Sequence, residues 1–305
     1  MLVNVQRISA RMALLLFALW PASLLAAPVL VDTEWLADRL GEPGLVLVDM
    51  ASDPTQYQRF HLPGAVYLPY EALVRQRKDG VVLRAPDERL FRVLGSLGIT
   101  ADDHVVIYDD IGGLQAGRLF WELERIGHAR VSVLDGGLVQ WILEGRKVEA
   151  TPVQPRKASY QPPGDGQRRN DVTLQEVQQA RDQGDVLLLD VRTQEEYQGD
   201  PRGKVPSGHI PGARWWPWDG SVDFGAGFRL KDRQQLEQSL AAVGAADKKQ
   251  PIVTYCRTGH RAAQSYLTLR SLGYENVRLY DGSMMEYQRD RMAPLARGPK
   301  PGVCC

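Results

Sequence analysis

Short apolar runs alternate with amphipathic stretches along the first half of the chain. Three runs have the length and the β-branched content of buried strands: 45–49, 104–108 and 131–134. Three stretches repeat their apolar residues with helical spacing: 33–40, 87–97 and 114–126. Because strands and helices alternate, we predict an α/β fold in which a parallel sheet is flanked by helices on both faces.

The second half of the chain repeats this pattern. Five segments match in the same order: 187–190 with 46–49, 209–213 with 61–65, 240–244 with 94–98, 252–255 with 105–108, and 280–282 with 134–136. The matches stay collinear from about residue 30 to about residue 290, which predicts two copies of one domain. A chain of 305 residues is long enough for two domains of ordinary size.

Composition sets the limits of the two predicted domains. Four prolines and few apolar residues lie between positions 151 and 167, which is typical of a linker. We therefore predict five segments: 1–27 as a leader, 28–150 as the N-terminal domain, 151–168 as the linker, 169–297 as the C-terminal domain, and 298–305 as a flexible tail rich in proline and glycine.

The leader has the features of a secretory signal peptide. Arg7 and Arg11 precede an apolar run from Met12 to Leu25, and small residues follow it. The run is short for a membrane span, so we expect cleavage near Ala26 and no stable membrane insertion afterwards. An uncleaved N-terminal anchor is the alternative. Export of this kind predicts a periplasmic protein.

Charge and cysteine content narrow the possible functions. Lysine plus arginine and aspartate plus glutamate both number 37, and this balance argues against nucleic-acid binding. Two of the three cysteines, Cys304 and Cys305, end the tail, so a disulfide framework is not expected. A tail thiol could accept sulfur from Cys256 or form a disulfide with it. We favour a mobile tail, because ordering it costs about 1 kcal/mol per residue.

Cys256 stands at the most informative point of the sequence. A predicted strand, 251–255, ends directly before it, and helical spacing begins a few residues later and stops at Gly273. A tight strand-to-helix loop directs backbone N–H groups and a helix dipole at one point. Arg257 and Arg261 add positive charge. This setting favours a reactive thiolate and an anion pocket over an inert buried cysteine.

The loop Cys256-x-x-Gly259-x-Arg261 resembles the active-site loop of rhodaneses, the thiosulfate sulfurtransferases. The His-Ile-Pro-Gly-Ala turn at 209–213, the Asp-x-Arg strand end at 190–192 and the tandem repeat are also similar to this family. The resemblance implies two tandem rhodanese-like domains. It also implies that Cys256 carries a persulfide, while Asp109, at the matching position of the first copy, leaves that copy silent. From the residues alone we expect Asp109 to cap its loop.

The predicted donor site surrounds Cys256. Backbone N–H groups from Arg257 through Thr258, Gly259 and His260 to Arg261 are candidates to bind the donor, together with the two arginine side chains. The resemblance implies that Arg192 also contacts substrate, whereas a surface salt bridge to Glu195 or Glu196 is the alternative. We expect the His260 side chain to face solvent. The cluster Trp215-Trp216-Pro217-Trp218 either walls the pocket or packs between domains.

The resemblance predicts a two-step transfer of sulfane sulfur. A small anionic donor such as thiosulfate gives its outer sulfur to Cys256, and a thiophilic acceptor, cyanide or a thiol, removes it. We expect no cofactor or metal, and a monomer. Cys256-Arg257, and Gln198 where the mercaptopyruvate branch has a second arginine, favour thiosulfate over mercaptopyruvate. The alternatives are a mercaptopyruvate enzyme, a persulfide carrier or binding module, and a cysteine phosphatase, whose loop is one residue longer.

Overall fold

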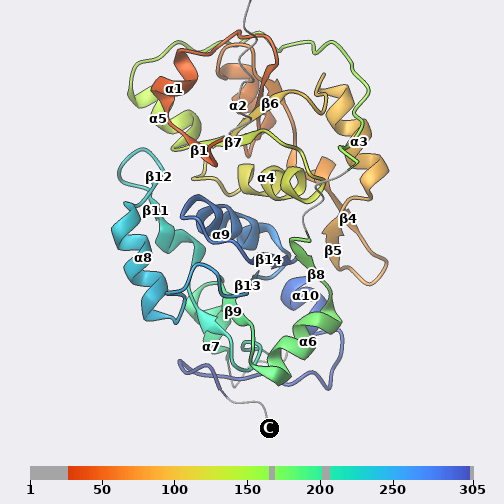
Figure 1. Ribbon diagram of the computed structural model, residues 1–305, viewed down its shortest axis with the longest axis vertical. Helices are drawn as coiled ribbons and strands as arrows, with labels where there is room; N and C mark the ends of the chain where they lie inside the picture. The colour runs from red at the N-terminus through yellow and green to blue at the C-terminus, as the bar shows by residue number, and fades with distance from the viewer. Residues whose placement is uncertain (1–26, 165–168, 201–206, 303–305) are drawn as a thin grey trace, which may run out of the picture.

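The computed structural model describes residues 27–164, 169–200 and 207–302. The predicted signal peptide up to Ala26 and the predicted tail cysteines Cys304 and Cys305 lie outside these residues. Figure 1 shows two α/β halves, one above the other, each built around its own sheet. None of the helices in the described ranges is long and apolar enough to cross a membrane.

Each half contains a five-stranded parallel sheet. In the N-terminal half the order is β1 (Leu30–Val31), β7 (Val131–Leu134), β6 (His104–Tyr108), β2 (Leu45–Asp49) and β3 (Val66–Tyr67). In the C-terminal half the order is β10 (Arg214–Trp215), β9 (Leu187–Asp190), β13 (Ile252–Tyr255), β14 (Val277–Tyr280) and β8 (Asp171–Val172). The predicted fold class is confirmed.

Helices flank both sheets, as the sequence predicts. The N-terminal half has α1 (Thr33–Ala37), α2 (Pro54–Arg59), the 3₁₀ helix η1 (Tyr70–Leu73), α3 (Asp87–Ser96), α4 (Ala116–Arg125) and α5 (Gly137–Leu143). The C-terminal half has α6 (Leu174–Gln183), α7 (Gln194–Gln198), η2 (Trp218–Ser221), α8 (Arg233–Ala242), α9 (His260–Ser271) and α10 (Ser283–Tyr287). The strands match the predicted bounds closely, whereas α4 begins two residues later than predicted.

The two halves meet along α4 and α9, which lie side by side at the centre of the molecule (Figure 1). Their backbones are so close that a Cβ on Gly117 would come within 2.9 Å of the carbonyl oxygen of Ala263. Apolar side chains of both helices, among them Phe120 and Tyr266, belong to one continuous core. The interface between the halves is therefore a packed apolar layer.

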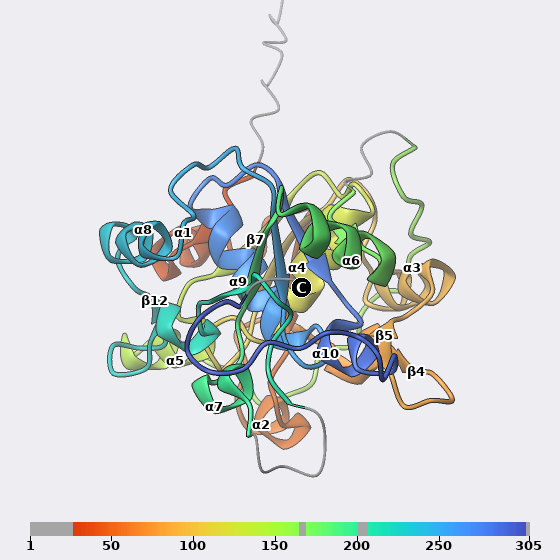
Figure 2. The ribbon, with the colours of Figure 1, turned by 90° about the horizontal axis from the view of Figure 1, so that it is seen from below.

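Each half also extends a β-hairpin onto the other half, as both views show (Figures 1 and 2). The hairpins are β4 (Val74–Gln76) with β5 (Val82–Arg84), and β11 (Val222–Asp223) with β12 (Arg229–Leu230). The Arg84 N–H donates to the Asp281 carboxylate at 2.5 Å, and the Leu230 N–H donates to Asp135 at 2.8 Å. Asp135 and Asp281 are matching positions in the repeat, so the two contacts are related by symmetry.

The linker and the tail lie against the domains where they are described. The Ala158 N–H donates to the Gly95 carbonyl, and Tyr160 is buried beside Phe91 and His128. Residues 298–302 form no helix or strand. The Pro301 carbonyl nevertheless accepts bonds from the Gly212 N–H and from His209 Nε2, so this part of the predicted tail is attached to the C-terminal domain.

Candidate active site

Cys256 lies at the carboxyl end of β13, the central strand of its sheet, and only 1% of its surface is exposed. α9 begins four residues later at His260. Gly259 has φ of +80°, and a Cβ there would come within 2.6 Å of Asp281, so the loop requires glycine at this position. The predicted strand, tight loop and helix are confirmed.

Hydrogen bonds to Ser283 fix the backbone of the cysteine loop. The N–H groups of Cys256 and Gly259 both donate to Ser283 Oγ at 3.1 Å, and the Ser283 hydroxyl donates to the Tyr280 carbonyl at 2.7 Å. The predicted donor role of the Gly259 N–H therefore needs correction, because this group already has a partner. The N–H groups of Arg257, Thr258, His260 and Arg261 have no partner in the described ranges and surround the cysteine at the start of α9.

Arg192 is committed to Asp190 at the end of the neighbouring strand. Its Nε and Nη2 donate to the Asp190 carboxylate at 2.9 and 2.5 Å, and Nη2 also donates to the Gly208 carbonyl at 2.8 Å. The alternative of a surface bridge to Glu195 or Glu196 is wrong, because Arg192 is buried and pairs within its own Asp-x-Arg motif. Substrate contact by Arg192 stays a prediction.

The two arginines of the loop differ in their partners. Arg261 donates from Nη1 and Nη2 to the two carboxylate oxygens of Glu196 at 2.6 and 2.9 Å. Arg257 is exposed and forms no ion pair with any residue that the structure describes. Among the arginines of this loop, Arg257 is thus the one whose guanidinium has no carboxylate partner in the part of the chain that the structure describes.

His260 does not face solvent, contrary to the prediction. Its ring lies 4.1 Å from the ring of Tyr70, and its Nε2 is 3.1 Å from Gln115 Oε1. Burial, together with the charges of Arg118 and Arg261, lowers the pKa of His260 to about 4, so the ring is neutral at pH 7. Tyr70 and Gln115 belong to the N-terminal half, which therefore supplies part of the wall around the Cys256 loop.

Arg118 is a second contribution of the N-terminal half. Its side chain is completely buried in α4, and its Nη1 donates to Asp281 Oδ1 at 2.6 Å. A Cβ on Gly259 would lie 3.3 Å from the same Nη1, so the guanidinium is directly behind the cysteine loop. Neither Arg118 nor Tyr70 is predicted from the sequence. The repeat offers one signal, since Pro69-Tyr70 matches Pro217-Trp218.

The matching loop of the N-terminal half is closed by its own carboxylate. Asp109 is buried and accepts N–H bonds from Ile111, Gly113, Gln115 and Ala116 at 2.8 to 3.1 Å. The carboxylate thus fills the position that an anion would take beside these N–H groups. The expected capping role of Asp109 is confirmed.

The tryptophans of 215–218 have structural contacts. Trp215 and Trp216 donate their Nε1–H groups to the Arg192 carbonyl and to Ser239 Oγ. Trp218 packs edge-on against Phe224 in the hairpin that contacts the N-terminal half. This contact lies within the C-terminal half, so both interpretations of the cluster stay predictions.

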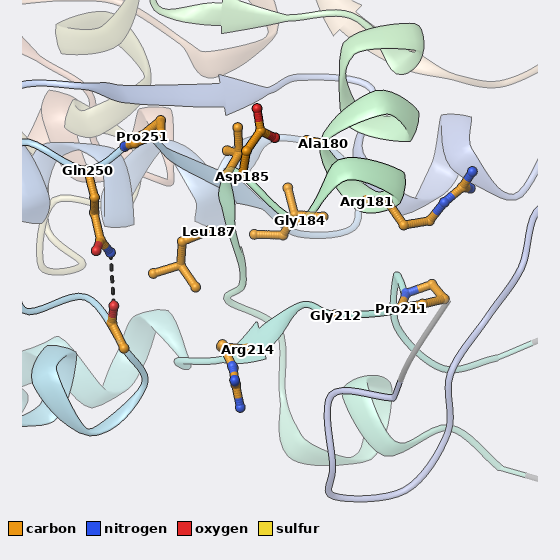
Figure 3. A pocket seen from close by; sticks show the side chains of 13 residues that line it. Ala180, Arg181, Gly184, Asp185, Leu187, Pro211, Gly212, Arg214, Gln250 and Pro251 are labelled. Carbon is orange, nitrogen blue, oxygen red and sulfur yellow. Dashed lines mark hydrogen bonds between the residues drawn. The ribbon is translucent and has the colours of Figure 1, made fainter. Parts of the chain in front are cut away.

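A separate hollow of about 300 Å³ lies at the opposite end of the C-terminal sheet (Figure 3). It opens between Gly184, Asp185 and Leu187 on one side and Gln250 and Pro251 on the other, where β9 and β13 begin. In open parallel sheets, ligands bind at the carboxyl ends of the strands. Cys256 is at that other end, so this hollow is not part of its site.

No group of histidine, cysteine and carboxylate residues in the described ranges is arranged to hold a metal ion. The site offers a cysteine nucleophile at a helix N-terminus, beside Arg257 and N–H groups that have no partner among the residues described.

Comparisons with known proteins show which family the chain is similar to. The model of the rhodanese-like domain family matches residues 32–144 and again residues 173–290. The chain is 33% identical to thiosulfate sulfurtransferase of Azotobacter vinelandii over 272 residues, 88% of this chain and 97% of the relative. It is 31% identical to the sulfur carrier protein TtuD of Thermus thermophilus over 284 residues, with the same coverage. The crystal structure of the 3-mercaptopyruvate sulfotransferase SseA from Escherichia coli aligns with a TM-score of 0.71 and 26% identity, covering 84% of this chain and 99% of SseA.

Proposed function

The chain belongs to the tandem-domain sulfurtransferases of the rhodanese-like family, and from this premise we propose that it transfers sulfane sulfur from thiosulfate to a thiophilic acceptor. The observation that carries the proposal is the position of Cys256 at the carboxyl end of β13, where α9 begins. A thiolate at this point faces the N-terminus of a twelve-residue helix. It is the one cysteine among the residues that the structure describes.

The first step forms the persulfide. The Cys256 thiolate attacks the outer sulfur of thiosulfate, a new S–S bond forms, and the old S–S bond breaks. Sulfite leaves with the electron pair. Negative charge that develops on the leaving group is stabilised by the N–H groups of Thr258, His260 and Arg261 and by the Arg257 guanidinium.

The second step regenerates the enzyme. An acceptor such as cyanide attacks the outer sulfur of the persulfide, and Cys256 leaves as the thiolate. The N–H groups of the loop can donate hydrogen bonds to the thiolate and to the persulfide, so both forms of Cys256 are stabilised. His260 is neutral at pH 7 and takes no part as an acid in this scheme.

The choice of thiosulfate over mercaptopyruvate rests on two residues. Arg257 directly follows Cys256 and extends its free charge toward solvent, which suits a dianion. Gln198 ends α7 where the mercaptopyruvate branch has an arginine for the carboxylate of its donor. Thiosulfate is therefore expected to give the higher kcat/KM when the two donors are compared side by side.

Periplasmic export and a monomeric state stay predictions from the sequence.

Replacement of Cys256 tests the proposed reaction. Thiosulfate treatment of the wild type should add one sulfur atom to the chain, located by mass spectrometry in a peptide that contains Cys256. Cys256→Ser should form neither this adduct nor thiocyanate from thiosulfate and cyanide, because the hydroxyl is a far weaker nucleophile at neutral pH. Thiocyanate formation by the serine variant at the rate of the wild type would refute the assignment. An adduct without turnover would favour a persulfide carrier.

A further inference from the structure

The ion pair between Arg261 and Glu196 joins α9 to α7 beside the cysteine. Both terminal nitrogens of Arg261 are taken by the carboxylate, which is the strongest arrangement for this pair. Burial acts to raise the pKa of Glu196, but the hydrogen bonds and the charge of Arg261 outweigh it, so the pKa is lowered and the group is ionised at neutral pH. The positive charge that Arg261 contributes to the loop is therefore largely cancelled.

The other buried cations near the loop are cancelled in the same way. Arg192 pairs with Asp190, and Arg118 pairs with Asp281 and Glu122. Of these pairs, Arg261 with Glu196 is the most accessible, with side-chain exposures of 21% and 31%. A carboxylate that is partly open to solvent beside a pocket for anions repels a dianion more than a monoanion.

We propose that Glu196 is a specificity-determining residue that limits the affinity of the Cys256 site for doubly charged sulfur donors. The inference rests on the proposed function and names the feature of the site that sets its charge preference. With Glu196 ionised, singly charged sulfane donors such as organic thiosulfonates gain relative to thiosulfate. Without it, Arg261 offers its full charge to a dianion.

Glu196→Gln removes the negative charge of this side chain and keeps the contacts that begin α7. Glu196 occupies the N3 position of a capping box with Thr193 at the start of α7, and glutamine serves in the same motif. The chain offers a matched control, because Glu176 has the same place in a capping box with Thr173 and pairs with Arg278. Glu176→Gln therefore removes the same charge and the same kind of ion pair, and keeps the capping box, at the start of the helix that follows the edge strand β8.

The first readout is donor kinetics. Glu196→Gln should lower KM for thiosulfate by roughly fivefold to tenfold, and KM for benzenethiosulfonate, a monoanion, by roughly two- to threefold, since the repulsion scales with donor charge. Glu176→Gln should change neither. Equal changes for the two donors, or no change in Glu196→Gln, would overturn the proposal.

The second readout does not depend on sulfur transfer. Cys256 is alkylated with iodoacetate, an anion, and with iodoacetamide, which is neutral, and the two rate constants are compared. Glu196→Gln should raise the ratio of the anionic to the neutral rate by roughly threefold, while Glu176→Gln should leave it unchanged. An unchanged ratio in Glu196→Gln refutes the role of Glu196. If the wild type makes no thiocyanate from thiosulfate, the proposed donor is wrong. The ratio of the two alkylation rates still tests the role of Glu196 in that case.

A double variant covers the case in which Glu196→Gln is unstable because Arg261 has lost its partner. Arg261→Gln leaves the Glu196 carboxylate without its partner, so the iodoacetate to iodoacetamide ratio should fall several-fold. Adding Glu196→Gln to this variant should restore the ratio, because the repelling charge is gone. A ratio that stays low in the double variant would contradict repulsion by Glu196.

Discussion

Asp190 and Asp49 end matching strands of the repeat and are both buried, but their carboxylates have different partners. Asp190 ends β9 and is neutralised by Arg192. Asp49 ends β2 and is followed by Met50 and Ala51, so its motif lacks the arginine. Its carboxylate accepts bonds from the Tyr108 hydroxyl at 2.5 Å and from the Ala51 N–H at 2.6 Å. Burial outweighs these bonds and raises the pKa of Asp49 to about 7.

Asp49 should make stability depend on pH. Its pKa rises from 3.8 to about 7 on folding, so the folded chain holds an extra proton between these values. The stabilisation is fully present below the lower value and is lost as pH rises through the higher one. Relative to Asp49→Asn, the wild type should lose roughly 2–3 kcal/mol of unfolding free energy from about pH 5 to about pH 8. Urea unfolding at several pH values measures this, and parallel curves for the two proteins would contradict it.

The sequence places Cys256 correctly but cannot orient the side chains around it. An Asp-x-Arg motif reads the same whether the arginine points at a donor or, as Arg192 does, at its own aspartate. The pairing of Arg261 with Glu196 crosses 65 positions and depends on how α7 lies beside α9. Charge balance around a site is thus a property of packing, which local sequence does not encode.

At the scale of elements, the start of α4 shows how a side chain sets a boundary. The sequence predicts a helix from Leu114, yet α4 begins at Ala116. Asp109 accepts the N–H groups of Gln115 and Ala116, which fixes the residues before Ala116 in a loop around the carboxylate. Strands are predicted more closely, because short apolar runs end sharply at a charged residue such as Asp49 or Asp190.

Asp109→Ala should destabilise this loop without changing the number of reactive sites. The substitution leaves four N–H groups without their acceptor, and a loss of about 2–4 kcal/mol of unfolding free energy is expected. Asp109→Asn, which keeps one acceptor oxygen, should cost less. Denaturant unfolding measures both. Thiosulfate should still add one sulfur atom per chain, and a change in that number would give Asp109 a role beyond capping.

At the scale of the whole molecule, both halves of the repeat contribute to the surroundings of the Cys256 loop. Each half covers the loop of the other, so Tyr70, Gln115 and Arg118 of the N-terminal half surround the Cys256 loop. The repeat is visible in the sequence, because its motifs recur in order. The contacts of each half with the loop of the other half are not visible in the sequence. Matching motifs show which residues are equivalent, but they do not show which copy those residues contact.

The two symmetry-related aspartates allow these contacts between the halves to be tested. Asp281→Ala removes the acceptor of the Arg84 N–H, and Asp135→Ala removes that of the Leu230 N–H. Each substitution leaves one hairpin N–H without its partner, at a cost of about 1–3 kcal/mol of unfolding free energy. Asp281→Ala should cost more than Asp135→Ala, because it also removes a partner of the buried Arg118 guanidinium. Asp281 also holds Arg118 behind Gly259, so Asp281→Ala alone should lower kcat/KM for sulfur transfer, by roughly tenfold or more, through displacement of the Cys256 loop.

Chemical unfolding and thiocyanate assays of both variants measure the two effects separately. Because the aspartates are equivalent in the repeat, Asp135→Ala controls for the loss of a contact between the halves, while the Cys256 loop keeps Arg118 and Tyr70 in place. A fall in activity only in Asp281→Ala, under conditions in which both variants are fully folded, would assign the N-terminal half a part in the active site. Equal activity in the two variants would mean that the hairpin contacts contribute to stability alone. The arrangement of the residues around Cys256 would then not depend on Asp281.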